Sequence, residues 1–319
     1  MKIGFFSVSS DQMFTNPNAS SGSGDELLLP MVRLAEEGKR EGVECLTVDM
    51  AGREEFDAFV SKLKAVGVNV IVAHDDKDLD TTDSIFPNNW VSFHENGDVA
   101  LYPMFAENRR KERRKEGLDL LECNGFVIKN IVDYTSAEVE GYCLEGTGSI
   151  LLDRVNSKAY CALSPRADED LFIEFCEDFE YTPVLFHAYH NVEDRRELIF
   201  HPNVMRALTE NDAIFCLDSY YYKKERKQII KNLLADGREI IKITEDQVNN
   251  FAGNMLQVIG KDNIRYTFMS EAAFKCLTND QVTRIEKYST ILYSNLETIE
   301  TCGGGSARCM MAEVFLKHF

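Results

Sequence analysis

Short apolar runs alternate with longer charged, amphipathic segments along most of the chain. An apolar run bounded by Gly, Asn, Asp or Pro predicts a strand, whereas apolar residues three or four positions apart in a charged segment predict a helix. The predicted strands are residues 68–73, 99–102, 149–153, 158–163, 197–204, 212–217 and 290–293. The predicted helices are residues 54–66, 107–123, 168–179, 222–235 and 270–288.

Two pairs of these strands have the spacing of hairpins. The first joins residues 149–153 to 158–163, and the second joins 197–204 to 212–217. A strand pair, a helix and a further strand follow one another several times, although the sequence itself does not repeat. The pattern alone therefore predicts an α/β or α+β fold with a divergent structural repeat.

No Pro- or Ser-rich linker divides the chain into two halves. Residues 16–24 have the composition of a flexible loop, but they lie too near the N-terminus to separate two cores. The 319 residues, 44% hydrophobic and 10% aromatic, are sufficient for a sizeable core. We therefore expect a single globular domain of residues 1–319.

The charge balance limits the class of partner. With 53 acidic and 35 basic residues the net charge is −18, which disfavours nucleic acid and anionic membranes. The basic segment 109–115 is interleaved with Glu112 and predicts a solvated helix face with one or two inward arginines. We expect neither a nucleic-acid partner nor a membrane partner.

The cysteines and the N-terminus bear on the compartment. No signal peptide and no run near the ~18 apolar residues of a membrane helix is visible. The nine scattered cysteines include no CxxC pair, so neither a disulfide framework nor a zinc site is indicated. These features favour a reducing, cytoplasmic location.

The last twenty residues contain the most distinctive chemical feature. Three successive glycines, Gly303 to Gly305, precede Arg308 and Cys309. Glycines allow a tight turn, and a cationic neighbour favours the thiolate, which is the nucleophilic form of cysteine. The alternative is a turn followed by an ordinary buried cysteine. Cys302 precedes the glycines and lacks an adjacent arginine, so we prefer Cys309 as the nucleophile.

Three further polar segments interrupt strand-like surroundings. Asp83 and the neighbouring amides of residues 88–89 suit a polar ligand, although the local sequence by itself favours an Asx turn capped by Pro87 and Asn88. Glu145 is followed by glycines that admit a ligand close to the backbone. His201 has the chemistry of a general acid or base, but a single histidine is also a common structural residue.

Together and in this chain order, these segments resemble the guanidine-group-modifying family. That family includes arginine deiminases, agmatine deiminases, dimethylarginine dimethylaminohydrolases and amidinotransferases. The resemblance covers nearly the whole chain and is closest to the branch of amidinotransferase-like, citrulline-utilisation hydrolases. It rests on residues 83–90, 101–104, 108–113, 251–255 and 303–310.

The resemblance implies a fold and a site. The fold is the pentein, a five-bladed α/β propeller around a central substrate channel, which agrees with the divergent repeat above. The resemblance places the nucleophile at Cys309, the catalytic histidine at His201 and the catalytic glutamate at Glu145. Its substrate-binding positions correspond to Asp83, Asn89, Asn203, Arg166 and Arg110, with Arg109 as the alternative to Arg110.

Two positions depart from the family's deiminases. Those enzymes have aspartate where this chain has Asn89, and His-x-Asp where it has His201-Pro202-Asn203. A buried guanidinium needs carboxylate partners, because an unpaired buried charge costs several kcal/mol. We therefore expect a less cationic reacting group, such as the ureido group of citrulline, to which amides offer donors and acceptors.

The implied chemistry is hydrolysis of a C–N bond. The Cys309 thiolate attacks the central carbon of a guanidino or ureido group, while His201 protonates the departing amine and then activates water. Glu145 orients the group, and neither a metal nor a cofactor is expected. The alternatives are an amidinotransferase that passes the group to an amine, and a non-catalytic binder of arginine-like ligands. The exact substrate, the pathway and the presence of a homo-oligomer stay open.

Overall fold

The computed structural model describes residues 4–9, 45–75, 81, 83–192 and 195–319. The loop predicted at residues 16–24 lies outside the described residues. In the described part no helix is both long and apolar enough to span a bilayer.

Most strands belong to three-stranded sheets that share one pattern. The sheets are β17-β1-β2, β3-β4-β5, β6-β7-β8, β11-β12-β13 and β14-β15-β16, and β9 and β10 form a separate pair. In each three-stranded sheet the middle strand is antiparallel to one neighbour and parallel to the other. This common pattern is the structural form of the divergent repeat.

The strand bounds show how short each strand is. They are β1 Gly4–Ser9, β2 Asn69–His74, β3 Val91–Phe93, β4 Asp98–Leu101, β5 Asn130–Asp133, β6 Ile150–Asp153, β7 Lys158–Ala162, β8 Thr182–Phe186, β9 Tyr189–Val192, β10 Arg195–Leu198, β11 Arg206–Leu208, β12 Asp212–Phe215, β13 Glu239–Lys242, β14 Leu256–Ile259, β15 Arg265–Ser270, β16 Thr290–Ser294 and β17 Ala312–Val314. Strands of this length are stable only where side chains from other elements cover them.

The helices are α2 Cys45–Ala65, α3 Lys115–Cys123, α4 Gly146–Ser149, α5 Glu169–Asp178, α6 Lys223–Ala235, α7 Glu245–Val248, α8 Glu271–Cys276, α9 Asn279–Glu286 and α10 Glu297–Gly303. Four of the helices, α5, α7, α8 and α9, begin at a residue whose side chain caps the first turn. The Asp168 side chain accepts from two amides of the first turn of α5, and Thr278 forms a capping box with Gln281 at α9. Short 3₁₀ turns, including η1 Pro87–Asn89, η2 Glu107–Glu112 and η4 Pro202–Val204, connect other elements.

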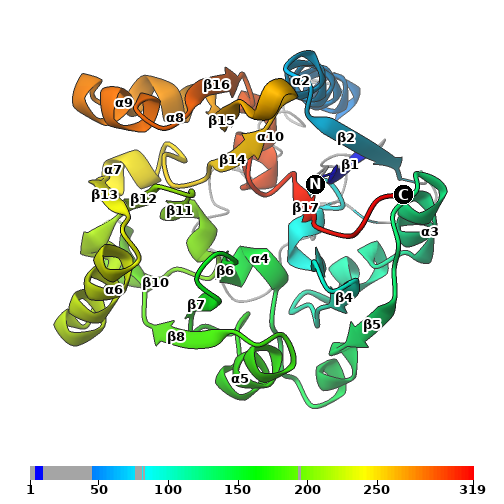
Figure 1. The fold of residues 1–319 in the computed structure, drawn as a ribbon, viewed down its shortest axis with the longest axis horizontal. Coiled ribbons are helices and arrows are strands. Elements are labelled where there is room, and N and C mark those ends of the chain that lie inside the picture. Colours follow the sequence, from blue (N-terminus) through cyan, green and yellow to red (C-terminus); the bar gives the residue numbers. More distant parts are fainter. Residues whose placement is uncertain (1–3, 10–44, 76–80, 82, 193–194) are drawn as a thin grey trace.

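The sheets follow one another in chain order around a common centre, and α2, α3, α5, α6 and α9 lie on the outside (Figure 1). The first and last strands share one sheet: β1 pairs antiparallel with β17 and parallel with β2. The turns that precede β6 and β17 lie toward the centre of the view.

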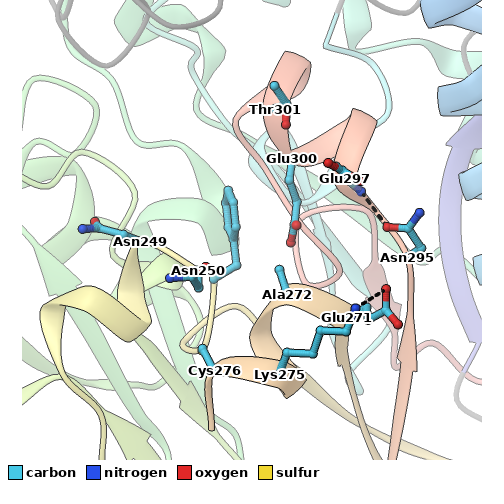
Figure 2. Close-up of a pocket in the computed structure, with 11 residues that line it drawn as sticks. Asn249, Asn250, Glu271, Ala272, Lys275, Cys276, Asn295, Glu297, Glu300 and Thr301 are labelled. Atoms are coloured by element: carbon cyan, nitrogen blue, oxygen red, sulfur yellow. Dashed lines mark hydrogen bonds and ion pairs between the residues drawn. The ribbon is translucent and has the colours of Figure 1, made fainter.

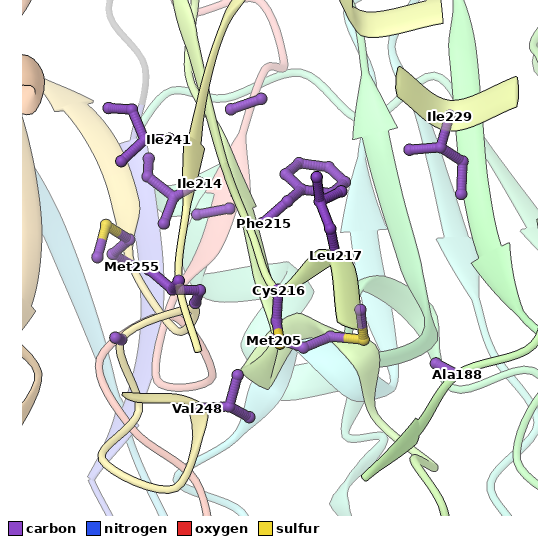
Figure 3. Close-up of a cluster of buried hydrophobic side chains, with 14 of the residues drawn as sticks. Ala188, Met205, Ile214, Phe215, Cys216, Leu217, Ile229, Ile241, Val248 and Met255 are labelled. Carbon is purple, nitrogen blue, oxygen red and sulfur yellow. The ribbon is translucent and has the colours of Figure 1, made fainter. Parts of the chain in front are cut away.

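The cores lie between sheets and their helices. The largest cluster joins residues of β7, β8, the β11–β13 sheet and α6, and Ile214, Phe215 and Ile241 are fully buried in it (Figure 3). A fully buried Ile or Phe contributes roughly 1.5–3 kcal/mol of hydrophobic stabilisation. A second cluster packs α2 and β14–β16 against residues 307–311, so the turn that contains Cys309 is part of a core.

The pattern of the sequence predicts many elements correctly. The predicted helix 54–66 is the second half of α2, helices 168–179 and 222–235 are α5 and α6, and strand 290–293 is β16. The first predicted hairpin is also confirmed, since β6 and β7 pair antiparallel.

The second hairpin is wrong in its first strand. Residues 197–204 contain the end of β10, then His201 and the 3₁₀ turn η4, and the strand that pairs with β12 is β11. Pro202 lies at the first position of η4, where its missing N–H and fixed φ favour a turn and prevent a continuous strand. His201 is therefore the N-cap of a turn instead of a strand residue.

Two predicted helices are each divided in two. Residues 107–123 form η2 and α3, because Arg114 between them is extended while Arg113 donates to Glu138 and to the carbonyl of Tyr102. Residues 270–288 form α8 and α9, because Leu277 is extended and the capping box at Thr278 starts a new helix. Periodicity does not distinguish one long helix from two short ones on the same face.

Candidate active site

Five of the predicted site residues lie on short turns that lead into the antiparallel edge strands β3, β6, β11 and β17 of different sheets. Asn89 ends η1 before β3, and Glu145 is the N-cap of α4 before β6. His201 and Asn203 belong to the turn before β11, and Cys309 to the turn before β17. Residues that are far apart in the sequence are thus presented by equivalent positions of the repeated sheet.

These turns approach one another so closely that two positions need glycine. A Cβ on Gly146, which has φ +34°, would lie 2.5 Å from the carbonyl oxygen of Asn88. A Cβ on Gly148 would lie 3.0 Å from Asn89 Oδ1 and 3.3 Å from His201 Cδ2. The glycines after Glu145 therefore let the turns of three sheets meet, whereas the sequence suggested that they admit a ligand.

The three glycines before Cys309 have separate roles. Gly303 ends α10, and Gly304 caps the helix in the left-handed conformation at φ +66°. A Cβ on Gly305 would lie 2.6 Å from the Phe86 ring. Ser306 then donates to Glu300 Oε1 at 2.5 Å, and the Cys309 amide donates to the Ser306 carbonyl at 2.9 Å.

The Cys309 thiol is buried and contacts two side-chain amides. Asn203 Nδ2 lies 3.3 Å and Asn254 Nδ2 lies 3.2 Å from the Cys309 sulfur. Arg308, the neighbour on which the sequence argument depended, donates to the Met311 carbonyl at 2.8 Å and to Glu313 at 2.9 Å. The donors to the sulfur are thus amides, and the adjacent guanidinium has other partners.

Glu145 is fully buried and holds two site residues together. Each of its oxygens lies 3.2 Å from Arg166 Nη1, and its Oε1 accepts from the Phe105 amide at 3.0 Å. Its Oε2 is also in short hydrogen-bond contact with His201 Nε2. Burial alone would raise the pKa of the Glu145 carboxyl, but Arg166 and His201 hold it well below the ordinary 4.5.

His201 lies between the carboxylate and an amide. Asn89 Nδ2 is 3.5 Å from the same Nε2 atom that contacts Glu145. Burial lowers the pKa of His201, and Glu145 opposes that shift without cancelling it. A neutral imidazole near working pH is able to accept and return a proton.

Of the two candidate arginines, Arg109 adjoins Asp83. Arg109 is buried, and its Nε lies 3.7 Å from Asp83 Oδ2 and 2.9 Å from Glu112 Oε1. Arg110 donates to the Met104 carbonyl at 3.1 Å and lies 3.3 Å from Glu138. Burial raises the pKa of Asp83, and Arg109 and Arg166 oppose the shift.

One residue at these turns was not singled out from the sequence. Asn254 contacts the thiol, and its only sequence signal is its place in the segment 251–255 that carries the resemblance. Asn88, which the sequence suggested together with Asn89 for a polar ligand, is fully buried, and neither amide atom has a hydrogen-bond partner among the described residues. Asn203 Oδ1 is likewise buried without a partner there. In the described ranges no group of three or more His, Cys, Asp or Glu has metal-binding geometry.

A cavity of about 560 Å³ lies at a different place (Figure 2). Its lining includes Asn250, Phe251, Lys275, Glu297 and Glu300 and contains none of the predicted site residues. Two of its lining residues are linked to the site: Glu300 accepts from Ser306, and the Phe251 carbonyl accepts from the Asn254 backbone amide.

Comparison with known proteins relates the chain to enzymes that act on arginine derivatives. The family model of the eukaryotic N,N dimethylarginine dimethylhydrolase matches residues 36–316. A sequence comparison with curated proteins finds no match.

Solved structures show the same fold at low sequence identity. The N-terminal domain of ArgZ, an arginine dihydrolase from the ornithine–ammonia cycle in cyanobacteria, matches at 14% identity and TM-score 0.71, over 98% of each chain. AgrE in complex with ornithine and NAD⁺ matches at 16% identity and TM-score 0.71, over 99% of this chain but 40% of AgrE. The adduct of dimethylarginine dimethylaminohydrolase with 4-chloro-2-hydroxymethylpyridine matches at 14% identity and TM-score 0.62, over 98% of this chain and 100% of that one.

Proposed function

The chain belongs to the N,N dimethylarginine dimethylhydrolase family, and from that premise we propose that it hydrolyses a C–N bond in the guanidino or ureido group of an arginine- or citrulline-like amino acid. The observation that carries the proposal is the turn η4: its Asn203 donates to the buried Cys309 thiol, which Asn254 also contacts, and its N-cap His201 contacts Glu145. A nucleophile, a proton carrier and a carboxylate that orients the carrier are the groups that covalent hydrolysis requires.

The reaction has two steps. His201 takes the proton of the Cys309 thiol, the resulting thiolate forms a C–S bond to the central carbon, and the C–N bond breaks as His201 passes that proton to the leaving amine. His201 then takes a proton from water as the water oxygen bonds to the same carbon, and the thiolate leaves. Glu145 keeps the imidazole in place throughout, because its Oε2 contacts Nε2.

The proposed substrate carries little charge at its reacting group. Asn88 and Asn203 offer three buried amide atoms without partners among the described residues, and all three are neutral. A ureido group has both N–H donors and a carbonyl acceptor, and so suits such amides, whereas a guanidinium requires carboxylates. Glu145 already binds Arg166 and His201. Asp83 and Arg109 are the proposed partners of the amino acid's own charged groups.

The proposal extends to the fold. The five three-stranded sheets, with their shared pattern and chain order around one centre, are the proposed blades of a pentein propeller within one domain of residues 1–319. The amidinotransferase alternative uses the same residues and differs only in accepting an amine in place of water.

The experiment compares Cys309→Ala with Cys302→Ala. We expect Cys309→Ala to abolish turnover of arginine, citrulline and dimethylarginine, measured by ammonia and product amine. Cys302→Ala removes a thiol at the end of α10 and retains activity. Intact-mass spectrometry of the wild type with each compound detects the Cys309 adduct. Full turnover by Cys309→Ala contradicts the proposal, and turnover that depends on an added amine identifies a transferase.

A further inference from the structure

Asn254 is a fully buried polar residue whose whole side-chain amide is used within the protein. Its Nδ2 donates to the Cys309 sulfur at 3.2 Å and to the Asn203 carbonyl at 3.2 Å. Its Oδ1 accepts from the Arg308 amide at 2.9 Å. Asn254 therefore joins the turn before β14 to the turns before β11 and β17.

The chain is built to place this side chain. Phe251 has φ +59°, a left-handed conformation that is uncommon for a residue with a side chain. The backbone N–H of Asn254 donates to the Phe251 carbonyl at 2.8 Å. Gly253 lies so close to the preceding turn that a Cβ would be 2.3 Å from the Val204 carbonyl oxygen. Backbone strain of this kind persists where the surrounding structure imposes it.

Asn203 and Asn254 both contact the sulfur, but they differ in what they leave open. Asn203 donates to the sulfur through Nδ2, and its buried Oδ1 has no partner among the described residues. Asn254 has both Nδ2 hydrogens and its oxygen engaged by the protein. Asn203 is therefore placed to contact a substrate as well, whereas Asn254 acts on the nucleophile alone.

Given the proposed function of Cys309, on which this inference rests, we infer that Asn254 is a further catalytic residue that stabilises the Cys309 thiolate and fixes its position. An N–H donor binds an anionic acceptor about twice as strongly as a neutral one, so the contact favours thiolate over thiol. The neutral amide of Asn254 thus stabilises the thiolate, as a cationic neighbour does at other reactive cysteines.

The test measures alkylation of Cys309 by iodoacetamide over a range of pH in Asn254→Asp. Aspartate has the same shape and retains an acceptor for the Arg308 amide, but it donates nothing to sulfur and adds a negative charge. We expect alkylation of Cys309 at neutral pH to slow by about tenfold or more, and its pH midpoint to move upward. Peptide mass spectrometry separates Cys309 from the exposed Cys123.

The matched control is Asn250→Asp, the same change at an exposed position four residues earlier. It leaves the alkylation profile unchanged. With substrate, Asn254→Asp lowers kcat much more than it changes KM, because Asn254 has no group left to bind substrate. Because the aspartate charge alone would raise the midpoint, Asn254→Leu, a neutral residue of similar size without a donor, is measured beside it. A purely structural role predicts no shift of the alkylation midpoint in folded Asn254→Leu.

A measurement on the unmodified protein covers the case in which Asn254→Asp does not fold. The side-chain amide NMR signal of Asn254 shifts with the same pH midpoint as Cys309 alkylation, and the Asn250 signal does not. An unchanged Asn254 signal, or unchanged alkylation in folded Asn254→Asp, overturns the inference. Those outcomes are independent of the proposed function, which fails instead if Cys309→Ala retains turnover.

Discussion

Glu145 shows how one buried carboxylate depends on its partners. The folded state holds its pKa below 4.5, the value expected when unfolded, because Arg166 and His201 outweigh the effect of burial. As pH falls through 4.5, the unfolded state takes up the proton first. The stability that Glu145 contributes is therefore fully present above pH 4.5 and is lost progressively below it.

Glu145→Gln should reveal this dependence in a His201→Asn background, where the histidine does not titrate. At neutral pH we expect the substitution to lower the free energy of unfolding by about 3 kcal/mol, because it leaves Arg166 without its carboxylate. This difference in the free energy of unfolding between glutamate and glutamine narrows below pH 4.5. Urea denaturation at neutral pH and below pH 4.5 measures it, with the exposed Glu140→Gln as the control. A difference independent of pH would contradict the account of Glu145.

Substitution of Asn89 tests whether the reacting group of the substrate is neutral. Its Nδ2 lies 3.5 Å from His201 Nε2, and Asn89→Asp would restore a carboxylate at that place. We expect kcat/KM for arginine relative to citrulline to rise by about tenfold, which corresponds to ~1.4 kcal/mol of differential stabilisation. Parallel assays with both compounds measure the ratio, and Asn250→Asp should leave it unchanged. A ratio that falls in Asn89→Asp would contradict the proposed neutral group.

At the scale of elements, the turns before the antiparallel edge strands β3, β6, β11, β14 and β17 position the site. Gly253→Ala should disturb one of them, because the new Cβ would lie 2.3 Å from the Val204 oxygen and 2.5 Å from the Arg206 nitrogen. We expect a loss of ~1–3 kcal/mol in stability, together with slower alkylation of Cys309, since the backbone must move.

Gly237→Ala is the control for that substitution. Gly237 has φ +76° and open space around its Cβ position, so alanine there costs only about 1 kcal/mol of backbone strain and leaves the site intact. Thermal denaturation and iodoacetamide alkylation compare the two variants. Equal effects of both on Cys309 would show that the close approach of Gly253 has no special role.

The sequence predicts elements where local forces decide them. Helix α5 has its cap at Asp168 and a regular apolar face, and its bounds were predicted within a residue or two. The prediction of a strand at residues 197–204 was wrong because Pro202 starts a 3₁₀ turn. The strand that pairs with β12 begins only after this turn, at Arg206. The break before α3 depends on the contact of Arg113 with Glu138, which no local pattern contains.

At the site, too, local motifs predict some residues, whereas contacts between distant segments decide others. Cys309, His201 and Glu145 were proposed from motifs, and the structure places His201 against Glu145. The contact of Asn254 with the sulfur joins residues 55 positions apart and follows only from the packing of two turns. For the same reason the sequence could not decide between Arg109 and Arg110, whose side chains diverge on one 3₁₀ turn.

At the scale of the whole molecule, the pairing of β1 with β17 brings the two ends of the described chain into one sheet. Cys309 lies three residues before β17, so the strand that completes this sheet also anchors the nucleophile's turn. Val314 and Leu316 are buried with Trp90 and Phe93, which ties the same segment to the neighbouring sheet. Removal of this segment should therefore affect the site as well as the stability.

Deletion of residues 312–319 tests that connection. It removes the antiparallel partner of β1 and three buried apolar side chains, of which Val314 and Leu316 are each worth roughly 1.5–3 kcal/mol. We expect a lower urea midpoint and loss of most turnover, with Cys309 alkylated without its normal pH dependence because its turn is no longer held. Deletion of Phe319 alone, whose side chain is 96% exposed, leaves both measurements near the wild type. Full turnover by the longer deletion would contradict this connection, because Asn203 and Asn254 would then hold the turn of Cys309 without β17.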